Sequence, residues 1–198
     1  MTHHRVAWSG AVALLVLALG PGAVAGPATD RLKPEIERVI NTLDNPALKG
    51  DGKAAERRQA VRSITDGVFD WTEMSRRALA RHWAPRTPAE QQEFVGLFRD
   101  LLERAYVSKI EKYSGEPVAF VSESTDGDQA TVRTKITTKQ NQDVPIDYRM
   151  VRHGDRWLIY DVVIENISLI GNYRTQFDGV IKTSSYGELV KRLKARTP

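Results

Sequence analysis

The sequence contains no cysteine. It therefore has neither the disulfide framework that is common in small exported domains nor a thiol nucleophile or a thiolate metal site. An ordinary hydrophobic core must stabilise the fold instead. The chain length suits one domain, because domains usually contain roughly 100 to 200 residues.

The sequence also lacks an apolar run of the length that a membrane-spanning helix needs, about 20 residues. Its N-terminal run, Ala11 to Leu19, follows Arg5 and precedes the small residues Ala23-Val24-Ala25. This order is typical of a secretory signal peptide. We expect residues 1–25 to be removed by cleavage near Ala25. Because no cysteine follows the run to carry a lipid anchor, we expect a mature protein that is free in the periplasm.

A strong charge of one sign is missing too. The formal net charge is +4 at pH 7, and the basic and acidic residues are mixed along the chain. Proteins that bind nucleic acid usually carry a concentrated basic stripe or patch. We therefore expect no nucleic-acid partner.

Residues that carry catalysis or bind metals are scarce. After the predicted signal peptide the only histidines are His82 and His153, which lie far apart in the sequence. No HExxH or GxSxG motif occurs, and no set of residues has the spacing of metal ligands. We therefore expect no catalytic residues, no metal site and no cofactor.

Helical periodicity is present in two separate parts of the chain. The clearest start is Thr87-Pro88-Ala89-Glu90, where Thr is the N-cap, Pro is the first helical residue and Glu returns to the cap. Asp70 and Glu73 have the same spacing before a shorter helix. The expected helices cover residues 29–43, 54–68, 70–79, 87–113, 168–183 and 186–193.

Between these two parts the apolar residues alternate, as in strands. Asp126-Gly127-Asp128 and His153-Gly154-Asp155 are typical of tight hairpin turns. The expected strands are 118–124, 129–138, 144–152 and 156–164. The pattern predicts an α+β fold, with an antiparallel meander of about four strands between N-terminal and C-terminal α-helices. We expect one domain over residues 26–198, with a helical part at 29–114, a sheet at 117–165 and C-terminal helices at 168–195.

The strand that begins near Trp157 is apolar on both sides, so we expect helices to cover it twice. Strict alternation places Leu158, Tyr160, Val162 and Ile164 on one face and Trp157, Ile159 and Val163 on the other, which Asp161 interrupts. Periodicity alone does not distinguish residues that fill a core from residues that line a cavity.

A family resemblance is carried by residues 157–169, 172–177, 144–149, 132–136 and Arg81-His82-Trp83 with the capped helix that follows. These stretches closely resemble the MlaC family of periplasmic lipid-binding proteins, also called toluene-tolerance auxiliary proteins. Asn166-Ile167 departs from the family pattern, in which we expect Gly-Val.

The resemblance implies a highly twisted antiparallel sheet, similar to the cone of nuclear transport factors, wrapped by helices so that acyl tails enter between the layers. It implies a soluble carrier that binds a phospholipid. It also implies two partners: an outer-membrane lipoprotein complex, and an inner-membrane ABC transporter with its substrate-binding-type partner protein.

On that basis we selected apolar and aromatic residues as candidate contacts for the lipid tails. The candidates are Phe98, Leu102, Tyr106, Val132, Ile146, Tyr148, Val163, Tyr173 and Phe177. Arg174 or Arg149 is the candidate for the phosphate of the headgroup. The alternative for both arginines is an ion pair, Arg149 with Asp147 and Arg174 with Asp178.

Two alternative functions remain open at this point. In the first alternative, the protein is a carrier whose cargo is a hopanoid or another polycyclic lipid. In the second, the protein is a periplasmic enzyme on a cone-shaped fold, which needs paired acidic or histidine side chains inside the cavity. Asp147 and Asp161 are the sheet carboxylates available for that role, and alternation places both opposite the apolar face of their strands.

Overall fold

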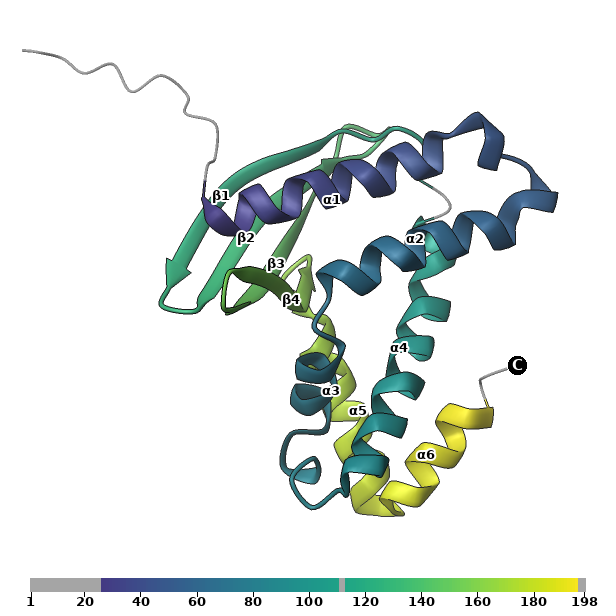
Figure 1. Ribbon diagram of the computed structural model, residues 1–198, viewed down its shortest axis with the longest axis vertical. Helices are drawn as coiled ribbons and strands as arrows, with labels where there is room; N and C mark the ends of the chain where they lie inside the picture. Colours follow the sequence, from purple (N-terminus) through teal and green to yellow (C-terminus); the bar gives the residue numbers. More distant parts are fainter. Residues whose placement is uncertain (1–25, 111–112, 196–198) are drawn as a thin grey trace, which may run out of the picture.

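A computed structural model describes residues 26–110 and 113–195 of the chain. The predicted signal peptide, residues 1–25, lies outside the described residues. Figure 1 shows two regions: a twisted sheet covered by the N-terminal helices, and a group of helices that extends below one end of that sheet. The helices that precede the sheet in the sequence are therefore divided between the two regions, and those that follow it belong to the second.

The sheet is covered by α1 (Pro27–Asp44) and α2 (Ala54–Val68). The 3₁₀ turns η1 (Pro46–Leu48) and η2 (Asp51–Lys53) connect the two helices. At the start of α1 the carboxylate of Glu123, on the sheet, accepts hydrogen bonds from the backbone N–H groups of Thr29 at 2.7 Å and Ala28 at 3.4 Å. These two hydrogen bonds fix the beginning of α1 on the sheet, because the first N–H groups of a helix have no partner inside it.

The second region contains α3 (Trp71–Leu79), η3 (Ala80–His82), α4 (Pro88–Ile110), α5 (Leu169–Thr183) and α6 (Tyr186–Ala195). We call α3, α4, α5 and α6 the bundle.

Both predicted helix caps are present. At the start of α4, Glu90 accepts from the Thr87 N–H at 2.8 Å and the Glu90 N–H donates to Thr87 Oγ1 at 3.3 Å, a reciprocal capping box. At the start of α3 only half of the box forms: Asp70 accepts from the Glu73 N–H at 2.9 Å. The Glu73 side chain instead pairs with the arginines of the next turn.

The sheet contains β1 (Val118–Asp126), β2 (Gln129–Thr137), β3 (Asp143–His153), β4 (Arg156–Ile164) and β5 (Ile167–Ser168), all antiparallel and in sequence order. The predicted α+β fold with an antiparallel meander is confirmed. The two-residue β5 was not predicted, and the sheet has five strands rather than about four.

A β-bulge in β4 changes which residues face the helices. Arg149 of β3 pairs with Asp161, but the next residue, Met150, pairs with Ile159, so that Tyr160 is an extra residue in β4. An extra residue on one strand reverses the alternation of side chains beyond it. The faces of β4 before and after Tyr160 are therefore not related by simple alternation.

The predicted division of β4 into two faces is wrong for this reason. Ile159 lies before the bulge, and Val162 and Ile164 lie after it, yet all three side chains point to the helix-covered side. Val163 is buried on the opposite side.

Asp161 ties the sheet to α5. Its carboxylate is almost fully buried and accepts hydrogen bonds from Ser168 Oγ at 2.6 Å, the Ile170 N–H at 3.0 Å and Arg149 at 3.1 Å. Ser168 is also the N-cap of α5, accepting from the Gly171 N–H at 2.9 Å. The start of α5 is therefore fixed to β4 by one buried carboxylate.

Two apolar clusters form the core. In the bundle, Phe98 packs its ring against Tyr173 and Phe177 at centroid distances of 5.3 and 5.4 Å, and Phe94 joins them. The second cluster lies between the sheet and the beginning of α1, where Leu32, Val132 and their neighbours are fully covered. Between these two clusters the interior is not filled.

Candidate functional site

A large cavity lies between α1, α2, the C-terminal part of α4 and the helix-covered face of the sheet. It has two adjoining lobes with volumes of about 240 Å³ and about 960 Å³, which we call the small lobe and the large lobe. They are parts of one hollow, because both are lined by Val61, Thr65, Phe69, Tyr106, Ile110, Ile146, Tyr148 and Ile164.

The large lobe is lined mainly by hydrocarbon. Ile36, Val39 and Ile40 project from α1 at helical spacing, and Ile136 and Ile146 face them from the sheet. These α1 side chains are only partly buried, although they point to the inside of the fold. An unfilled apolar space of this size is costly for an empty protein and suits an apolar ligand.

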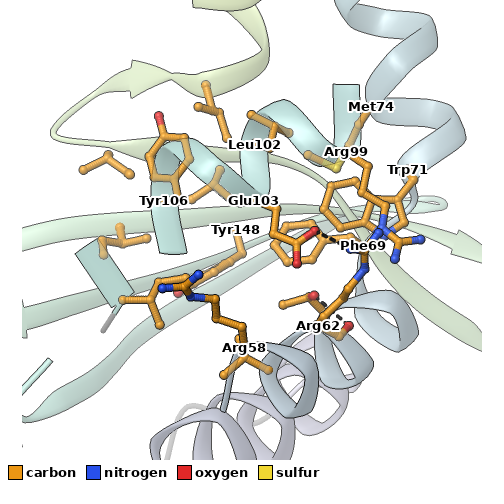
Figure 2. Close-up of a pocket in the computed structure, with 17 residues that line it drawn as sticks. Arg58, Arg62, Phe69, Trp71, Met74, Arg99, Leu102, Glu103, Tyr106 and Tyr148 are labelled. Carbon is orange, nitrogen blue, oxygen red and sulfur yellow. Dashed lines mark hydrogen bonds and ion pairs between the residues drawn. The ribbon is translucent and has the colours of Figure 1, made fainter. Parts of the chain in front are cut away.

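The small lobe is also mainly apolar, but charged side chains of α2 and α4 border it, as Figure 2 shows. Arg62 of α2 forms ion pairs with Glu103 at 3.1 Å and with Asp100 at 3.3 Å on α4. Arg99 of α4 pairs in the other direction with Asp66 of α2 at 3.0 Å. The two helices are thus joined by ion pairs at this lobe.

Tyrosines line the junction of the lobes. Burial raises the pKa of Tyr106, and it raises the pKa of Tyr148 to about 12. Both phenols therefore keep their protons at neutral pH and remain hydrogen-bond donors.

Four of the predicted tail contacts line this cavity: Leu102, Tyr106, Ile146 and Tyr148. They come from α4 and β3, so the fold brings together residues that are about 40 positions apart.

The other predicted tail contacts lie elsewhere. Phe98, Tyr173 and Phe177 pack together in the bundle. Val132 is fully covered in the cluster below α1, and Val163 is buried on the far side of β4. None of these five is among the described residues that line the two lobes, and a direct contact with lipid stays a prediction for them.

The two arginine candidates also lie away from the cavity wall. Arg149 pairs with Asp161 instead of the expected Asp147. Arg174 is exposed on α5, and among the described residues it has no ion pair with Asp178.

Asp178 has other partners. Its carboxylate pairs with Arg81 at 2.6 Å, Lys182 at 2.7 Å and His82 at 2.9 Å. Hydrogen bonds from Lys182, His82 and Arg81 hold the pKa of Asp178 well below its usual range. Two of these partners come from η3, which sequence spacing along α5 could not indicate.

Sequence reasoning missed most of the α1 and α2 wall. Ile36, Val39 and Ile40 were recognised only as a helix face, and Phe69 and Trp71 were not selected at all. The length of the apolar stripe on α1 is the signal that could have indicated these residues. Of this stripe only Leu32 and Leu43 are buried, and the residues between them are left to line the cavity.

The lining offers little for acid–base or metal chemistry. Among the described residues, the lining carboxylates are Glu35, Glu103 and Glu116; Glu35 pairs with Arg31 and Arg38, and Glu103 pairs with Arg62. Neither Asp147 nor Asp161 lines the cavity. In residues 26–110 and 113–195, no three His, Cys, Asp or Glu side chains are grouped so that they could hold a metal ion. Within the same residues no helix has the length and apolar character needed to cross a membrane.

Comparison with known proteins gives a consistent result. A family described as "MlaC protein" matches residues 33–195. The toluene tolerance protein ttg2D of Pseudomonas putida is 23% identical over 120 residues, which are 60% of this chain and 56% of that protein. The intermembrane phospholipid transport system binding protein MlaC of Haemophilus influenzae is 25% identical over 114 residues, 54% of this chain and 53% of that protein. The matched part therefore spans about half the length of these curated relatives.

A solved structure is similar over nearly its whole length. It is described as the phospholipid-binding protein from Ralstonia solanacearum in complex with a phospholipid. It is 28% identical to this chain, with a TM-score of 0.77, and the similarity covers 85% of this chain and 96% of that one.

Proposed function

This chain belongs to the MlaC family, and on that premise we propose that it is a periplasmic carrier that holds the acyl tails of a phospholipid in the two-lobed cavity. The observation that carries the proposal is the cavity itself: an apolar hollow, with lobes of about 240 and 960 Å³, between helices and sheet. The similar structure that was solved with a phospholipid supports the choice of cargo.

The physical need for such a carrier follows from the cargo. A phospholipid with about 30 tail methylenes gains on the order of 24 kcal/mol when the tails leave water, at about 0.8 kcal/mol each. Release into water is therefore negligible. Moving the tails from a bilayer to an apolar cavity exchanges one dry environment for another, so the net free energy of transfer can be small. Because exposure of the tails to water is so costly, the lipid has to pass directly between docked proteins.

The proposed tail contacts are the residues that surround both lobes. They include four of the candidates selected from the sequence: Leu102, Tyr106, Ile146 and Tyr148. The α1 residues Ile36 and Ile40 complete the large lobe.

We propose that the headgroup phosphate lies at the small lobe, beside the guanidinium groups of Arg62 and Arg99. Each guanidinium has five N–H donors, so it can keep its carboxylate partner and still donate to a phosphate. Arg174 is exposed on α5 and outside the lining, and a headgroup contact there stays a prediction.

The partners are part of the same proposal. Family membership supports exchange with an outer-membrane lipoprotein complex and with an inner-membrane ABC transporter and its substrate-binding-type partner protein. The predicted signal peptide supports a periplasmic location. The described part of the lining has no histidine and no unpaired couple of carboxylates that would favour the enzyme alternative.

Native mass spectrometry of the protein purified from an envelope extract tests the proposal, followed by lipid extraction and tandem identification of the bound molecule. We expect one two-tailed phospholipid per protein molecule. A hopanoid at the same stoichiometry would replace phospholipid as the cargo. A protein that is empty, and that takes up no lipid from vesicles, would contradict the carrier function.

A further inference from the structure

Tyr148 lies where the two lobes of the cavity meet. It lies in the middle of β3, paired with Val132 on one side and Val162 on the other, and its side chain lines both lobes. Apolar side chains from α4, β3 and β4 surround it there. A hydroxyl at this place loses the hydrogen bonds of water when a ligand fills the cavity, and this loss costs free energy unless the ligand offers a partner.

Other tyrosines of the fold satisfy their hydroxyl groups within the protein. Tyr113 donates to the backbone carbonyl of Glu116 at 2.8 Å, Tyr186 to the carbonyl of Glu90 at 3.2 Å, and Tyr160 to Gln129 Oε1 at 3.3 Å. Within the described residues, the hydroxyl of Tyr148 has no hydrogen-bond partner. It is therefore available to a molecule inside the cavity.

The neighbouring polar groups restrict what that molecule offers. The hydroxyl of Thr65, which lines both lobes, already donates to the Arg62 carbonyl at 2.9 Å. The arginines of the small lobe are donors and cannot accept from a phenol. The Tyr148 hydroxyl is thus a free donor that faces both lobes, whereas the unpaired indole N–H of Trp71 lines the small lobe. The ligand group complementary to Tyr148 is a neutral acceptor next to an apolar chain.

We propose that the Tyr148 hydroxyl donates a hydrogen bond to an ester carbonyl of the bound lipid, and that the cavity thereby distinguishes ester-linked from ether-linked tails. The inference rests on the proposed function, because it assumes a glycerolipid in the cavity. It adds the chemical class of the linkage that the site recognises.

The arrangement of the cavity fits the order of groups in a glycerophospholipid. In such a lipid the ester carbonyls lie between the phosphate and the tails. In the protein, Tyr148 lies between the arginine wall of the small lobe and the hydrocarbon of the large lobe, and Figure 2 shows its side chain directed toward the side on which Arg58 projects from α2. A phosphate beside the arginines therefore leaves the ester groups at the depth of Tyr148.

The test is competition between two phosphatidylcholines with the same chain length, one diacyl and one dialkyl ether, for protein stripped of lipid. Native mass spectrometry gives the ratio of the two complexes for the wild type, for Tyr148→Phe and for Tyr186→Phe. Tyr186→Phe is the matched control, because Tyr186 packs in the bundle outside both lobes and its hydroxyl bonds to the protein.

We expect the wild type and Tyr186→Phe to favour the diacyl lipid by about two- to tenfold, the range of one hydrogen bond, and Tyr148→Phe to bind both lipids equally. A wild-type ratio near one would overturn the inference without any variant, and so would an unchanged preference in Tyr148→Phe. If the wild type binds neither lipid, the proposed function itself fails, and this outcome is distinct from loss of the preference alone.

Discussion

The bundle and the sheet region use apolar residues for opposite purposes. In the bundle, the rings of Phe94, Phe98, Tyr173 and Phe177 pack at centroid distances between 5.3 and 5.8 Å. In the sheet region, aliphatic residues of α1 face a twisted sheet across a lobe of about 960 Å³. Apolar composition determines which face of a helix or strand points to the interior. The size of the side chains and the distance between the elements determine whether that interior is packed or hollow.

Helix α4 shows the difference within one stripe of residues. Phe98, Leu102 and Tyr106 lie one turn apart, yet Phe98 belongs to the bundle core, Leu102 lies at its edge and Tyr106 lines the cavity. The first part of α4 thus belongs to the packed core of the bundle, and its last part belongs to the proposed ligand site.

The largest effect is expected from Phe98→Ala in the bundle. Removing a fully buried ring from a close-packed core costs about 3–5 kcal/mol of unfolding free energy. Urea unfolding of lipid-free protein measures this, and the lipid bound per folded molecule should not change. If instead bound lipid falls while stability changes by less than about 1 kcal/mol, then Phe98 contacts the tails and the division of α4 is wrong.

The joint between the two regions gives the next effect. Asp161→Asn keeps the size of the side chain but removes the charge that accepts from Ser168, Ile170 and Arg149, and should cost about 2–3 kcal/mol. Asp147→Asn is the matched control on the neighbouring strand, because Asp147 forms only a 3.9 Å pair with Arg133. Thermal or urea unfolding should show a change below about 0.5 kcal/mol for that control. Equal losses in both variants would show that Asp161 does not anchor α5.

Tyr106→Glu should reduce lipid binding rather than stability. A carboxylate at the junction of the lobes has to be desolvated when tails enter, so we expect occupancy to fall at least about tenfold, equivalent to about 1.4 kcal/mol. Gln92→Glu adds the same charge to an exposed position of α4 and should bind normally. Native mass spectrometry of both proteins after mixing with phospholipid vesicles gives the comparison. Full occupancy in Tyr106→Glu would exclude the junction as a tail site.

The smallest effect concerns the Glu123 bond that fixes α1, the wall of the large lobe. Partial burial raises the pKa of Glu123, but hydrogen bonds from Thr29, Ala28 and Thr125 outweigh it, so the net pKa is lowered. A lowered folded-state pKa contributes stability above the unfolded value, near 4.3, and this stability is lost as the pH falls through the folded value.

Glu123→Gln should therefore lose about 1 kcal/mol at pH 7, the usual contribution of a helix cap, and lose less relative to the wild type as the pH falls below about 4. Urea unfolding at both pH values measures the difference, with Glu37→Gln on the exposed side of α1 as the control. A difference that does not depend on pH would show that the charge of Glu123 is not the stabilising feature.

Features determined by neighbouring residues could be predicted from the sequence. The capping box of Thr87 and Glu90 and the hairpin at Asp126-Gly127-Asp128 are local, and the structure contains α4 and the β1–β2 pairing where these residues indicated them. The resemblance of residues 157–169 to the MlaC family gave the correct family and an antiparallel sheet with covering helices.

Features that depend on distant contacts could not be predicted. The extra residue Tyr160 in β4 is visible only in the pairing with β3, and it moved Val163 to the far face. Asp178 found partners on η3 instead of Arg174, one turn away on its own helix. Whether Phe98 or Tyr106 meets a cavity depends on how far the sheet stands from α4, which no sequence period encodes.

Photo-crosslinking tests the central claim most directly. The lipid-free protein is loaded with a phospholipid that carries a diazirine near the end of one acyl chain, irradiated, digested and mapped by tandem mass spectrometry. We predict crosslinks to the cavity wall, on α1 near Ile36 and Ile40, on α4 near Tyr106 and on β3 near Ile146. Crosslinks concentrated at Phe94, Phe98 and Phe177 in the bundle would contradict the assignment of the hollow region as the lipid site.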